Sequence, residues 1–218
     1  MEELLEEQSD VSTWRILRIM SELVAGFDFL RSHRRTVTFF GSARTKPNNL
    51  WYAEAEALAY KLSKLGFTIV TGAGPGIMEA ANKGAHDAGG ISAGVAIKLE
   101  HEEKANPYVT RLETFKYFFV RKIMLAYSSK MYIFFPGGVG TLDELFEIIT
   151  LIQTRKIRSV PIILVDKKFW SPLLEWVKHT LYEKNAMISE EDMDIYTLVD
   201  DIDDAYAHIA TLQKKKAI

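Results

Sequence analysis

Hydrophobic residues along this chain follow two alternating patterns, short continuous runs and longer stripes at helical spacing. The runs predict strands that are buried on both faces of a sheet, and the stripes predict helices. The predicted strands are residues 36–40, 67–70, 91–97, 108–111, 131–135 and 160–165. The predicted helices are residues 51–65, 77–88, 115–127, 141–154, 170–183 and 201–212. This alternation predicts an α/β fold, a single doubly wound, Rossmann-like parallel sheet flanked by helices.

The N-terminal part of the chain follows a different pattern. An apolar stripe from Trp14 to Leu30 predicts an added helix, with residues 10–12 as its cap. We therefore divide the chain into an N-terminal helical extension, residues 1–34, and a Rossmann-like domain, residues 35–218. The stripe is equally compatible with packing on the chain's own core and with contact to another subunit.

Composition narrows the chemistry available to such a domain. The chain has no cysteine, which excludes disulfides, thiol nucleophiles and cysteine-ligated metals. Its 27 basic and 29 acidic residues give a net charge of −2, so it lacks the basic field of proteins that coat nucleic acid. The five histidines are scattered without the spacing of metal ligands, and we expect neither a metal nor a cofactor.

The chain shows no sign of export or of a membrane partner. Residues 1–7 are acidic where a secretory signal is basic. No apolar run approaches the ~20 residues of a membrane span. We therefore expect a cytoplasmic protein.

Two glycine-rich turns follow predicted strands and are expected at the carboxyl edge of the sheet. The first, Gly72–Gly76, departs from the G-x-G-x-x-G pattern by one position, so it suits a structural turn as well as a phosphate cradle. The second, residues 136–144, places three glycines and Thr141 at a predicted helix start, where free N–H groups form an anion site. Two such turns predict a phosphate-bearing ligand. No Gly-Lys-Ser/Thr follows, which argues against ATP-driven phosphoryl transfer.

The charged residues near the second turn have two interpretations each. Asp143 and Glu144, placed in the first helical turn, can offset the helix dipole. Glu144 can instead point into the site to orient water or to stabilise positive charge. Arg121 and Lys122 interrupt an apolar stretch and are either a solvated face or, if Arg121 turns toward the glycines, a fork for phosphate or carboxylate. Spacing alone leaves both questions open.

These motifs resemble the Lonely Guy family of cytokinin-activating nucleoside-monophosphate phosphoribohydrolases, whose members were often labelled lysine decarboxylase-like. The family signature P-G-G-x-G-T-x-x-E is complete at residues 136–144, and its Arg-Lys pair matches Arg121 and Lys122. The resemblance spans residues 36–181. It implies hydrolysis of the N-glycosidic bond of a purine ribonucleoside 5′-monophosphate to the free base and ribose 5-phosphate. It also implies a homodimer or larger homo-oligomer.

By the same resemblance, Arg121 and Glu144 are the catalytic pair. The implied substrate-binding residues are Gly41, Ser42, Gly74, Gly76, Met78, Glu100, Lys122, Gly137, Gly138, Val139, Gly140, Thr141 and Thr150. The chain departs from many plant members at Phe119, where they have histidine, and at Glu79, where they have glycine. The preferred base, prenylated adenine, adenine or a pyrimidine, therefore stays open.

Two other functions compete with hydrolysis. A non-catalytic nucleotide-binding or sensing protein on the same fold would not need the pair of Arg121 and Glu144. A pyridoxal phosphate enzyme would need a lysine placed in a cofactor pocket, and Lys122 lies next to an arginine without an evident pocket. We favour the hydrolase over both.

Overall fold

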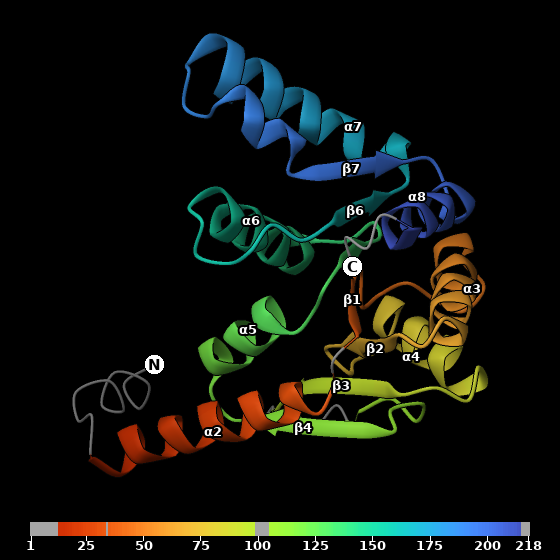
Figure 1. Cartoon of the computed structure of the whole chain (residues 1–218), viewed down its shortest axis with the longest axis vertical. Helices are drawn as coiled ribbons and strands as arrows, with labels where there is room; N and C mark the ends of the chain where they lie inside the picture. Colours follow the sequence, from red (N-terminus) through yellow and green to blue (C-terminus); the bar gives the residue numbers. More distant parts are fainter. Residues whose placement is uncertain (1–12, 34, 99–104, 215–218) are drawn as a thin grey trace.

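A computed structural model describes residues 13–33, 35–98 and 105–214 (Figure 1). Within these residues, seven parallel strands form one sheet in the order β4-β3-β2-β1-β5-β6-β7. The strands are β1 (Thr36–Phe40), β2 (Thr68–Thr71), β3 (Ser92–Ile97), β4 (Arg111–Phe115), β5 (Tyr132–Phe134), β6 (Ile162–Val165) and β7 (Tyr196–Val199). The chain builds the sheet outward from β1 in one direction and then from β5 in the other, which confirms the predicted doubly wound architecture.

Helices cover both faces of this sheet (Figure 1). They are α2 (Thr13–Arg31), α3 (Leu50–Lys64), α4 (Ile77–Asp87), α5 (Phe118–Tyr127), α6 (Val139–Gln153), α7 (Lys167–Trp176), η1 (Val177–Lys184), η2 (Glu190–Asp194) and α8 (Ile202–Lys214). Helices α3, α4 and α8 pack on one face, and α5, α6 and α7 pack on the other. Helix α2 lies outside α5 and β4.

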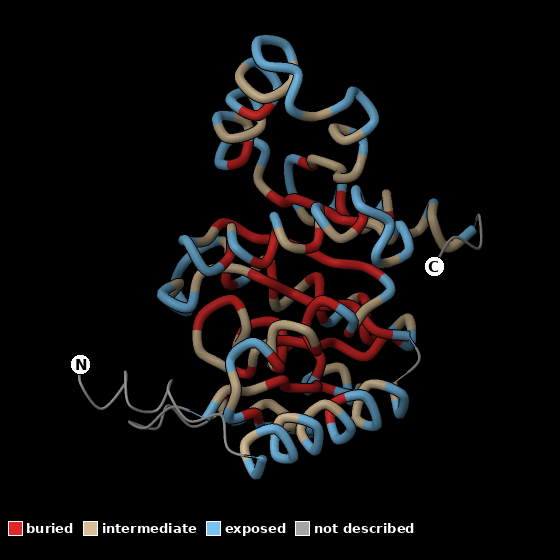
Figure 2. Tube along the Cα trace, turned by 90° about the vertical axis from the view of Figure 1, so that its left-hand side faces the viewer, coloured by how far each residue is buried: buried red, intermediate tan, exposed pale blue. Residues whose placement is uncertain are grey.

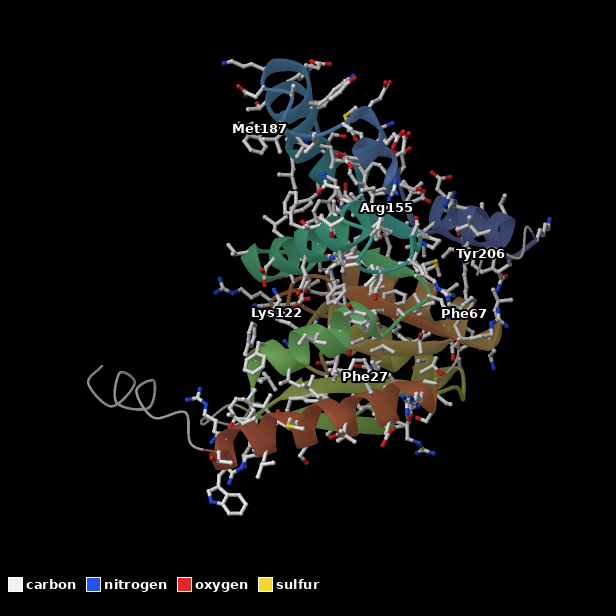
Figure 3. The ribbon with its side chains drawn as sticks, turned by 60° about the vertical axis from the view of Figure 1, so that its left-hand side comes forward. Phe27, Phe67, Lys122, Arg155, Met187 and Tyr206 are labelled. Atoms are coloured by element: carbon white, nitrogen blue, oxygen red, sulfur yellow. The ribbon has the colours of Figure 1, made fainter. Side chains whose placement is uncertain are left out.

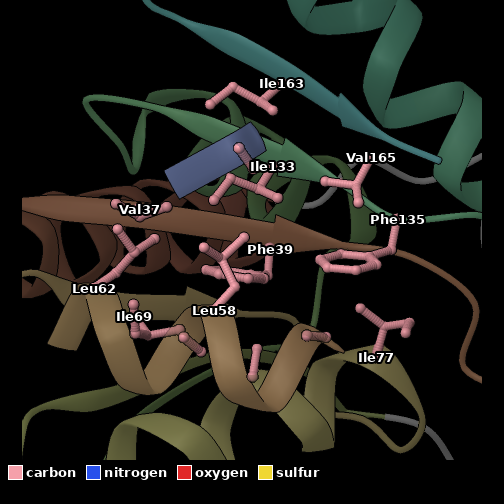
Figure 4. Packing of buried hydrophobic residues seen from close by; sticks show 14 of the residues in the cluster. Val37, Phe39, Leu58, Leu62, Ile69, Ile77, Ile133, Phe135, Ile163 and Val165 are labelled. Carbon is pink, nitrogen blue, oxygen red and sulfur yellow. The ribbon is translucent and has the colours of Figure 1, made fainter. Parts of the chain in front are cut away.

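Side chains that alternate along the strands build a separate hydrophobic core on each face. Val37 and Phe39 of β1 belong to the core under α3, α4 and α8, whereas Phe40 belongs to the opposite core. Figure 4 shows the first core, in which Leu58 of α3 reaches toward Phe39. Buried residues follow the strands through the middle of the molecule (Figure 2). Each large apolar side chain that is fully buried contributes about 1.5–3 kcal/mol, which holds the strand ends and the loops after them in place.

The two edge strands differ from the sequence prediction. The strand predicted at residues 108–111 is wrong in position, because β4 occupies Arg111–Phe115 and pairs with β3. No prediction covers β7. Both strands are only partly buried, and β4 lacks the continuous apolar run that marks β6. Strand β7 has only four residues, and its sequence is as apolar as that of β1. The helix predicted from residue 115 accordingly begins at Phe118, and the one predicted at residues 170–183 divides into α7 and the wider turns of η1.

Helix α2 confirms the apolar stripe predicted near the N-terminus, and one side of it packs on the domain. Gly26 is buried so close to Met124 of α5 that a Cβ at this position would collide with the Met124 side chain. The Glu22 carboxylate accepts hydrogen bonds from the backbone N–H groups of Lys116 and Tyr117, at 3.1 and 3.2 Å. These contacts fix α2 against the start of α5, which carries residues of the site.

The other side of α2 is exposed. Trp14, Met20 and Val24 each have more than half of their surface accessible. The predicted cap, residues 10–12, lies outside the described residues. Among the helices that the structure describes, none combines the length and the hydrophobicity needed to cross a membrane.

Candidate functional site

The direction of winding reverses between β1 and β5, which pair with Phe40 opposite Phe134. At such a reversal the loops that leave the two strands diverge and open a crevice at the carboxyl edge of the sheet. Hydrogen bonds fix the loop after β1 to both glycine turns. The Ser42 N–H donates to the Pro136 carbonyl at 3.1 Å, and the Ile77 N–H donates to the Ser42 carbonyl at 3.1 Å.

A cavity of about 630 Å³ opens at this edge. It is lined by Phe40, Gly41, Ser42, Ala43, Arg44, Gly72, Met78, Phe118, Arg121, Leu125, Gly138, Val139, Gly140, Thr141, Asp143 and Glu144. The structure therefore brings together nine of the residues that the sequence singled out, Gly41, Ser42, Met78, Arg121, Gly138, Val139, Gly140, Thr141 and Glu144.

The start of α6 presents open backbone to the cavity. Gly138 is the N-cap and offers no side chain to the first N–H groups of the helix. The Leu142 N–H makes the first helical bond, to the Gly138 carbonyl at 3.1 Å, so the N–H groups of Val139, Gly140 and Thr141 precede the helical ladder. A Cβ added to Gly138 or Gly140 would meet no atom within 4 Å. Open N–H groups and the positive end of the helix dipole make this position suited to an anion.

Glu144 lies on α6, one turn beyond these donors, and only 6% of its surface is exposed. Its Oε2 atom is buried and has no hydrogen-bond partner within the described part of the chain. Burial raises the pKa of the Glu144 carboxyl to about 7. The positive charges of Lys122 and Arg121 act in the opposite direction, while the charge of Glu147 adds to the rise. A carboxyl group with this pKa exchanges its proton near neutral pH, as general acids and bases do.

The interpretation of Asp143 and Glu144 as caps of the helix dipole is wrong. Helix α6 begins at Val139, two residues earlier than predicted, and its first turn contains no acidic residue. Asp143 pairs with Lys122 instead. Glu144 lines the cavity. It lies beyond the first turn of α6, so an interaction with the helix dipole does not explain its position.

Arg121 reaches the same cavity from α5. Its Nε donates to the Val95 carbonyl of β3 at 3.0 Å. Burial lowers the pKa of the Arg121 guanidinium from its ordinary value, and the charge of Glu144 opposes this. A Cβ at Gly72 would collide with Nη2 of Arg121, so the guanidinium lies directly against the first glycine turn. Arg121 thus supplies a fixed cation opposite the start of α6.

The structure separates Lys122 and Thr150 from this cavity. Both line a second groove of about 470 Å³ along α6. Figure 3 shows Lys122 on α5. Its Nζ donates to the Asp143 carboxylate at 2.5 Å and lies 3.3 Å from Glu147 Oε2. Burial acts to lower the pKa of Lys122, but these carboxylates and Glu144 outweigh it and raise that pKa. Lys122 therefore acts on the site as a charge near Glu144 rather than as a lining residue.

The remaining predicted glycines support the loops. A Cβ at Gly41 would overlap the Ile77 side chain, and one at Gly74 would overlap Met78. Gly76 has φ +71°, and a Cβ there would collide with the Ser42 carbonyl oxygen. Gly74 and Gly76 do not line the cavity.

Gly137 also lies apart from the cavity. It lines a neighbouring one of about 420 Å³, with its backbone against Thr141. The predicted Glu100 is outside the described residues.

The two departures from the plant pattern also lie away from the cavity. Phe119 is exposed, and its ring lies against Tyr117. Glu79 accepts a hydrogen bond from the Tyr52 hydroxyl at 3.0 Å. Burial and this bond raise the pKa of Tyr52 above its ordinary value. Neither departure removes a group from the cavity wall.

The sequence analysis does not single out several residues that line the cavity, among them Phe40, Arg44, Phe118 and Leu125. A signal for two of them is present. Phe118 and Leu125 flank Arg121 at helical spacings of three and four residues, so the three side chains share one face of α5. Arg44 lies in the loop after β1, where spacing carries no information about direction. Among the described residues, no cluster of three or more His, Asp or Glu could hold a metal ion.

Solved structures of low identity share the fold. The molybdenum cofactor carrier protein from Chlamydomonas reinhardtii has a TM-score of 0.61 at 21% identity, over 83% of this chain and 99% of that one. DNA processing protein A from Streptococcus pneumoniae has a TM-score of 0.55 at 18% identity, over 83% of this chain and 62% of that one. Identities this low establish likeness of fold alone.

Sequence comparisons are more specific. Residues 78–209 match the family described as possible lysine decarboxylase. Cytokinin riboside 5′-monophosphate phosphoribohydrolases from Mycobacterium marinum and Rhodococcoides fascians are 30% and 28% identical to the chain. The matches cover 79% and 68% of this chain, and 91% and 77% of those proteins. The rice protein of the same name is 31% identical over 69% of this chain and 62% of its own length. The chain therefore belongs to the Lonely Guy family, whose model carries the possible lysine decarboxylase description.

Proposed function

We propose that the protein hydrolyses the N-glycosidic bond of a purine ribonucleoside 5′-monophosphate in the cavity between β1 and β5, and that it releases the base and ribose 5-phosphate. The relatives from Mycobacterium marinum and Rhodococcoides fascians are named for this activity toward a cytokinin riboside monophosphate. The observation that carries the proposal is the state of Glu144. The residue lines the cavity at which α6 begins, and its Oε2 atom is buried without a hydrogen-bond partner in the described chain.

The start of α6 supports binding of the 5′-phosphate. Its open N–H groups and the Thr141 hydroxyl are donors, and Gly138 and Gly140 leave room for a close approach. Glu144 follows Thr141 by three residues, a rise of about 4.5 Å along the helix. A nucleotide with its phosphate at the helix start therefore has its ribose near the Glu144 carboxylate, which fixes the reacting carbon.

The carboxylate of Glu144 suits the chemistry at that carbon. When the bond between C1′ and the base nitrogen breaks, its electron pair leaves with the base and positive charge develops on the ribose, as in glycoside hydrolysis. Glu144 stabilises this charge and accepts a proton from the water whose oxygen bonds to C1′. The base takes up a proton from solvent and Glu144 returns its own, so one water is divided between the products.

The other walls of the cavity suit a base and a second anion contact. Phe40, Met78, Phe118 and Leu125 provide apolar surface for a flat ring. The Arg121 guanidinium keeps its charge at any working pH and can hold the phosphate or orient Glu144. A comparison of AMP with N6-prenylated AMP as substrates decides whether the preferred base is adenine or its prenylated form.

The decarboxylase description of the family does not fit these residues. Decarboxylation through pyridoxal phosphate needs a lysine amine that is free to bond the cofactor. The amine of Lys122 is held by Asp143 and Glu147, which raise its pKa, and it lies outside the cavity of Arg121 and Glu144. We therefore assign no step to that cofactor.

A carrier that binds a nucleotide-like ligand without cleaving it is the second candidate. The observation in its favour is the shared fold with the molybdenum cofactor carrier protein from Chlamydomonas reinhardtii. The start of α6 would serve such a ligand equally well. Glu144 argues against it, because a carboxylate beside a bound anion weakens binding, and a protein that only binds gains nothing from it.

We also propose that the chain forms a homodimer or a larger homo-oligomer. Trp14 and Val24 of α2 are 77% and 63% exposed, and Phe118 and Tyr127 of α5 are also exposed. Exposed apolar side chains on neighbouring helices are typical of protein interfaces. Sedimentation velocity at micromolar concentration is expected to show a dimer or larger species, and a monomer throughout would contradict the proposal.

The activity is tested by incubating the purified protein with AMP, N6-prenylated AMP, a pyrimidine nucleoside monophosphate or adenosine. Chromatography then separates the released base. We expect base and ribose 5-phosphate in equal amounts from at least one purine monophosphate, and none from adenosine, which lacks the phosphate that binds α6. If no monophosphate yields a base, the protein is not this hydrolase.

A further inference from the structure

Four buried polar side chains form a network beside the first glycine turn, and the proposed hydrolysis does not use them directly. They are Thr71 at the end of β2, Asn82 on α4, Ser92 on β3 and Asn106 before β4. The Thr71 hydroxyl donates to Asn82 Oδ1 at 2.6 Å, and the Asn106 amide donates to the same oxygen at 2.9 Å. The Asn82 amide donates to the Ser92 hydroxyl at 2.8 Å. Such a closed buried network specifies one arrangement of its parts.

The network ends on the backbone of the Gly72–Gly76 turn. The second N–H of the Asn106 amide donates to the Gly74 carbonyl at 3.0 Å, and the Asn106 backbone N–H donates to the Ala73 carbonyl at 2.9 Å. The Ala73 N–H donates to the Thr71 hydroxyl at 2.9 Å. Ala73 has φ +64°, a left-handed conformation that side chains disfavour and that persists only where neighbours enforce it. Here the hydrogen bonds that Ala73 makes with Thr71 and Asn106 enforce this conformation.

This turn is the surface on which the Arg121 guanidinium lies. Any Cβ at Gly72 would collide with Nη2 of Arg121, so the two are in direct contact. On its other side Arg121 is tied to the Val95 carbonyl. Apart from the Val95 carbonyl, the guanidinium has no hydrogen-bond partner within the described residues. A movement of the turn therefore shifts the guanidinium or removes the surface on which it rests.

We infer that Asn106 is a positioning residue, which holds the strained Gly72–Gly76 turn and through it the Arg121 guanidinium at the cavity. The inference rests on the proposed function, since it gives Arg121 a task there. Asn106 itself does not line the cavity. Its effect on a bound nucleotide must therefore pass through the turn.

The test is a double-mutant cycle between Asn106 and Arg121. Asn106→Asp keeps the shape but places an oxygen opposite the Gly74 carbonyl and Asn82 Oδ1, which opposes the turn. We expect kcat/KM for AMP to fall about tenfold or more, as small displacements of positioned groups do. In the Arg121→Lys background, the same change should then cost less than about twofold, because coupled residues are not additive.

The matched control is Thr36→Val. Thr36 is buried at the opposite end of β1, and its hydroxyl donates one hydrogen bond to the Ser128 carbonyl at 2.6 Å. It should lower stability like the Asn106 variant but leave kcat/KM unchanged. Asn106→Ala, which adds no opposing oxygen, replaces Asn106→Asp if that variant does not fold.

Two results would overturn the inference. One is an Asn106 variant whose kcat/KM matches the Thr36→Val control, and the other is a full, multiplicative loss in the Arg121→Lys background. If the unchanged protein binds AMP or its N6-prenylated form without cleaving either, the proposed function fails by itself, and the same cycle is then measured on the dissociation constant of the nucleotide that binds. If the protein binds neither nucleotide, both proposals fail.

Discussion

The two glycine turns at the carboxyl edge of the sheet look alike in sequence and differ in structure. The Gly72–Gly76 turn is closed, because its carbonyls accept hydrogen bonds from Asn106 and its glycines fit against other backbone and side chains. The turn before α6 is open at Gly138 and Gly140, where nothing occupies the space of a Cβ. The first turn needs glycine because side chains there would collide with the packed protein. At Gly138 and Gly140 of the second turn, packing leaves space for a side chain.

This difference indicates which turn meets the ligand. Glycines required by packing are explained without function, whereas Gly138 and Gly140 are explained by a group that approaches the backbone from the cavity. Glu144 follows the open turn, and Arg121 rests against the closed one. We therefore expect the closed turn to position Arg121 and the open turn to bind the ligand.

Gly76→Ala tests the closed turn and has the largest expected effect on stability. The left-handed conformation at φ +71° costs an alanine ~1–2 kcal/mol, and the collision with the Ser42 carbonyl adds ~1–3 kcal/mol. We expect the free energy of unfolding in urea to fall by about 3 kcal/mol. A variant as stable as the unchanged protein would show that the turn is not closed.

Glu144→Gln tests whether the buried carboxylate of Glu144, which follows the open turn, lowers the stability of the folded protein. Folding raises the pKa of Glu144 from 4.5 to about 7, so the folded state binds the proton more tightly than the unfolded state between these values. The unchanged protein therefore loses stability as the pH rises through this range. Glutamine avoids the loss, and we expect the variant to be more stable at pH 8 by about 3 kcal/mol.

At pH 4 the two proteins should unfold at the same urea concentration, since Glu144 is then protonated in both states. The control is Glu113→Gln. Glu113 is half-buried on β4, and neither of its carboxylate oxygens is both buried and without a hydrogen-bond partner. A stability difference at pH 8 no larger than that of the control would contradict the buried, unpaired state of Glu144.

Gly140→Ala separates fold from function at the open turn. Alanine favours a helix over glycine by about 1 kcal/mol and meets no atom at this position, so stability should hold or rise slightly. The added methyl group occupies the space proposed for the phosphate, and we expect AMP to bind about tenfold more weakly, a loss of ~1.4 kcal/mol. Isothermal titration calorimetry measures the binding. Unchanged affinity would place the ligand elsewhere.

Lys122→Met gives the smallest expected effect. If the Glu144 carboxylate accepts the proton of water, kcat/KM rises with pH and reaches half its maximum near the Glu144 pKa of about 7. Lys122 lowers that pKa, so its loss should move the midpoint to higher pH by about half a unit to one unit. A pH profile of kcat/KM for both proteins measures the shift, and a midpoint that moves down would contradict the assignment.

Sequence predicts the parts of this molecule whose side chains alternate in simple patterns. The buried strands β1 and β6 and the helices between strands follow from continuous runs and helical stripes. The edge strand β4 does not, because its largely exposed residues mix polar and apolar types. The edge strand β7 has only four residues, and nothing in their pattern sets it apart from a loop. Motifs similarly predicted the placement of Arg121 and Glu144 in one cavity. They did not show that Lys122 turns away to Asp143, since adjacent residues on a helix point in different directions.

The most direct test of the account compares Glu144→Gln with the unchanged protein on the same nucleotide. Turnover of AMP is measured by release of adenine, and binding of AMP by calorimetry. We expect the variant to lose ~10²–10⁴-fold in kcat, the usual contribution of a general base, while the dissociation constant stays within about tenfold. A kcat that falls by less than about tenfold would contradict the account, because the open turn would then bind a nucleotide whose cleavage does not depend on Glu144.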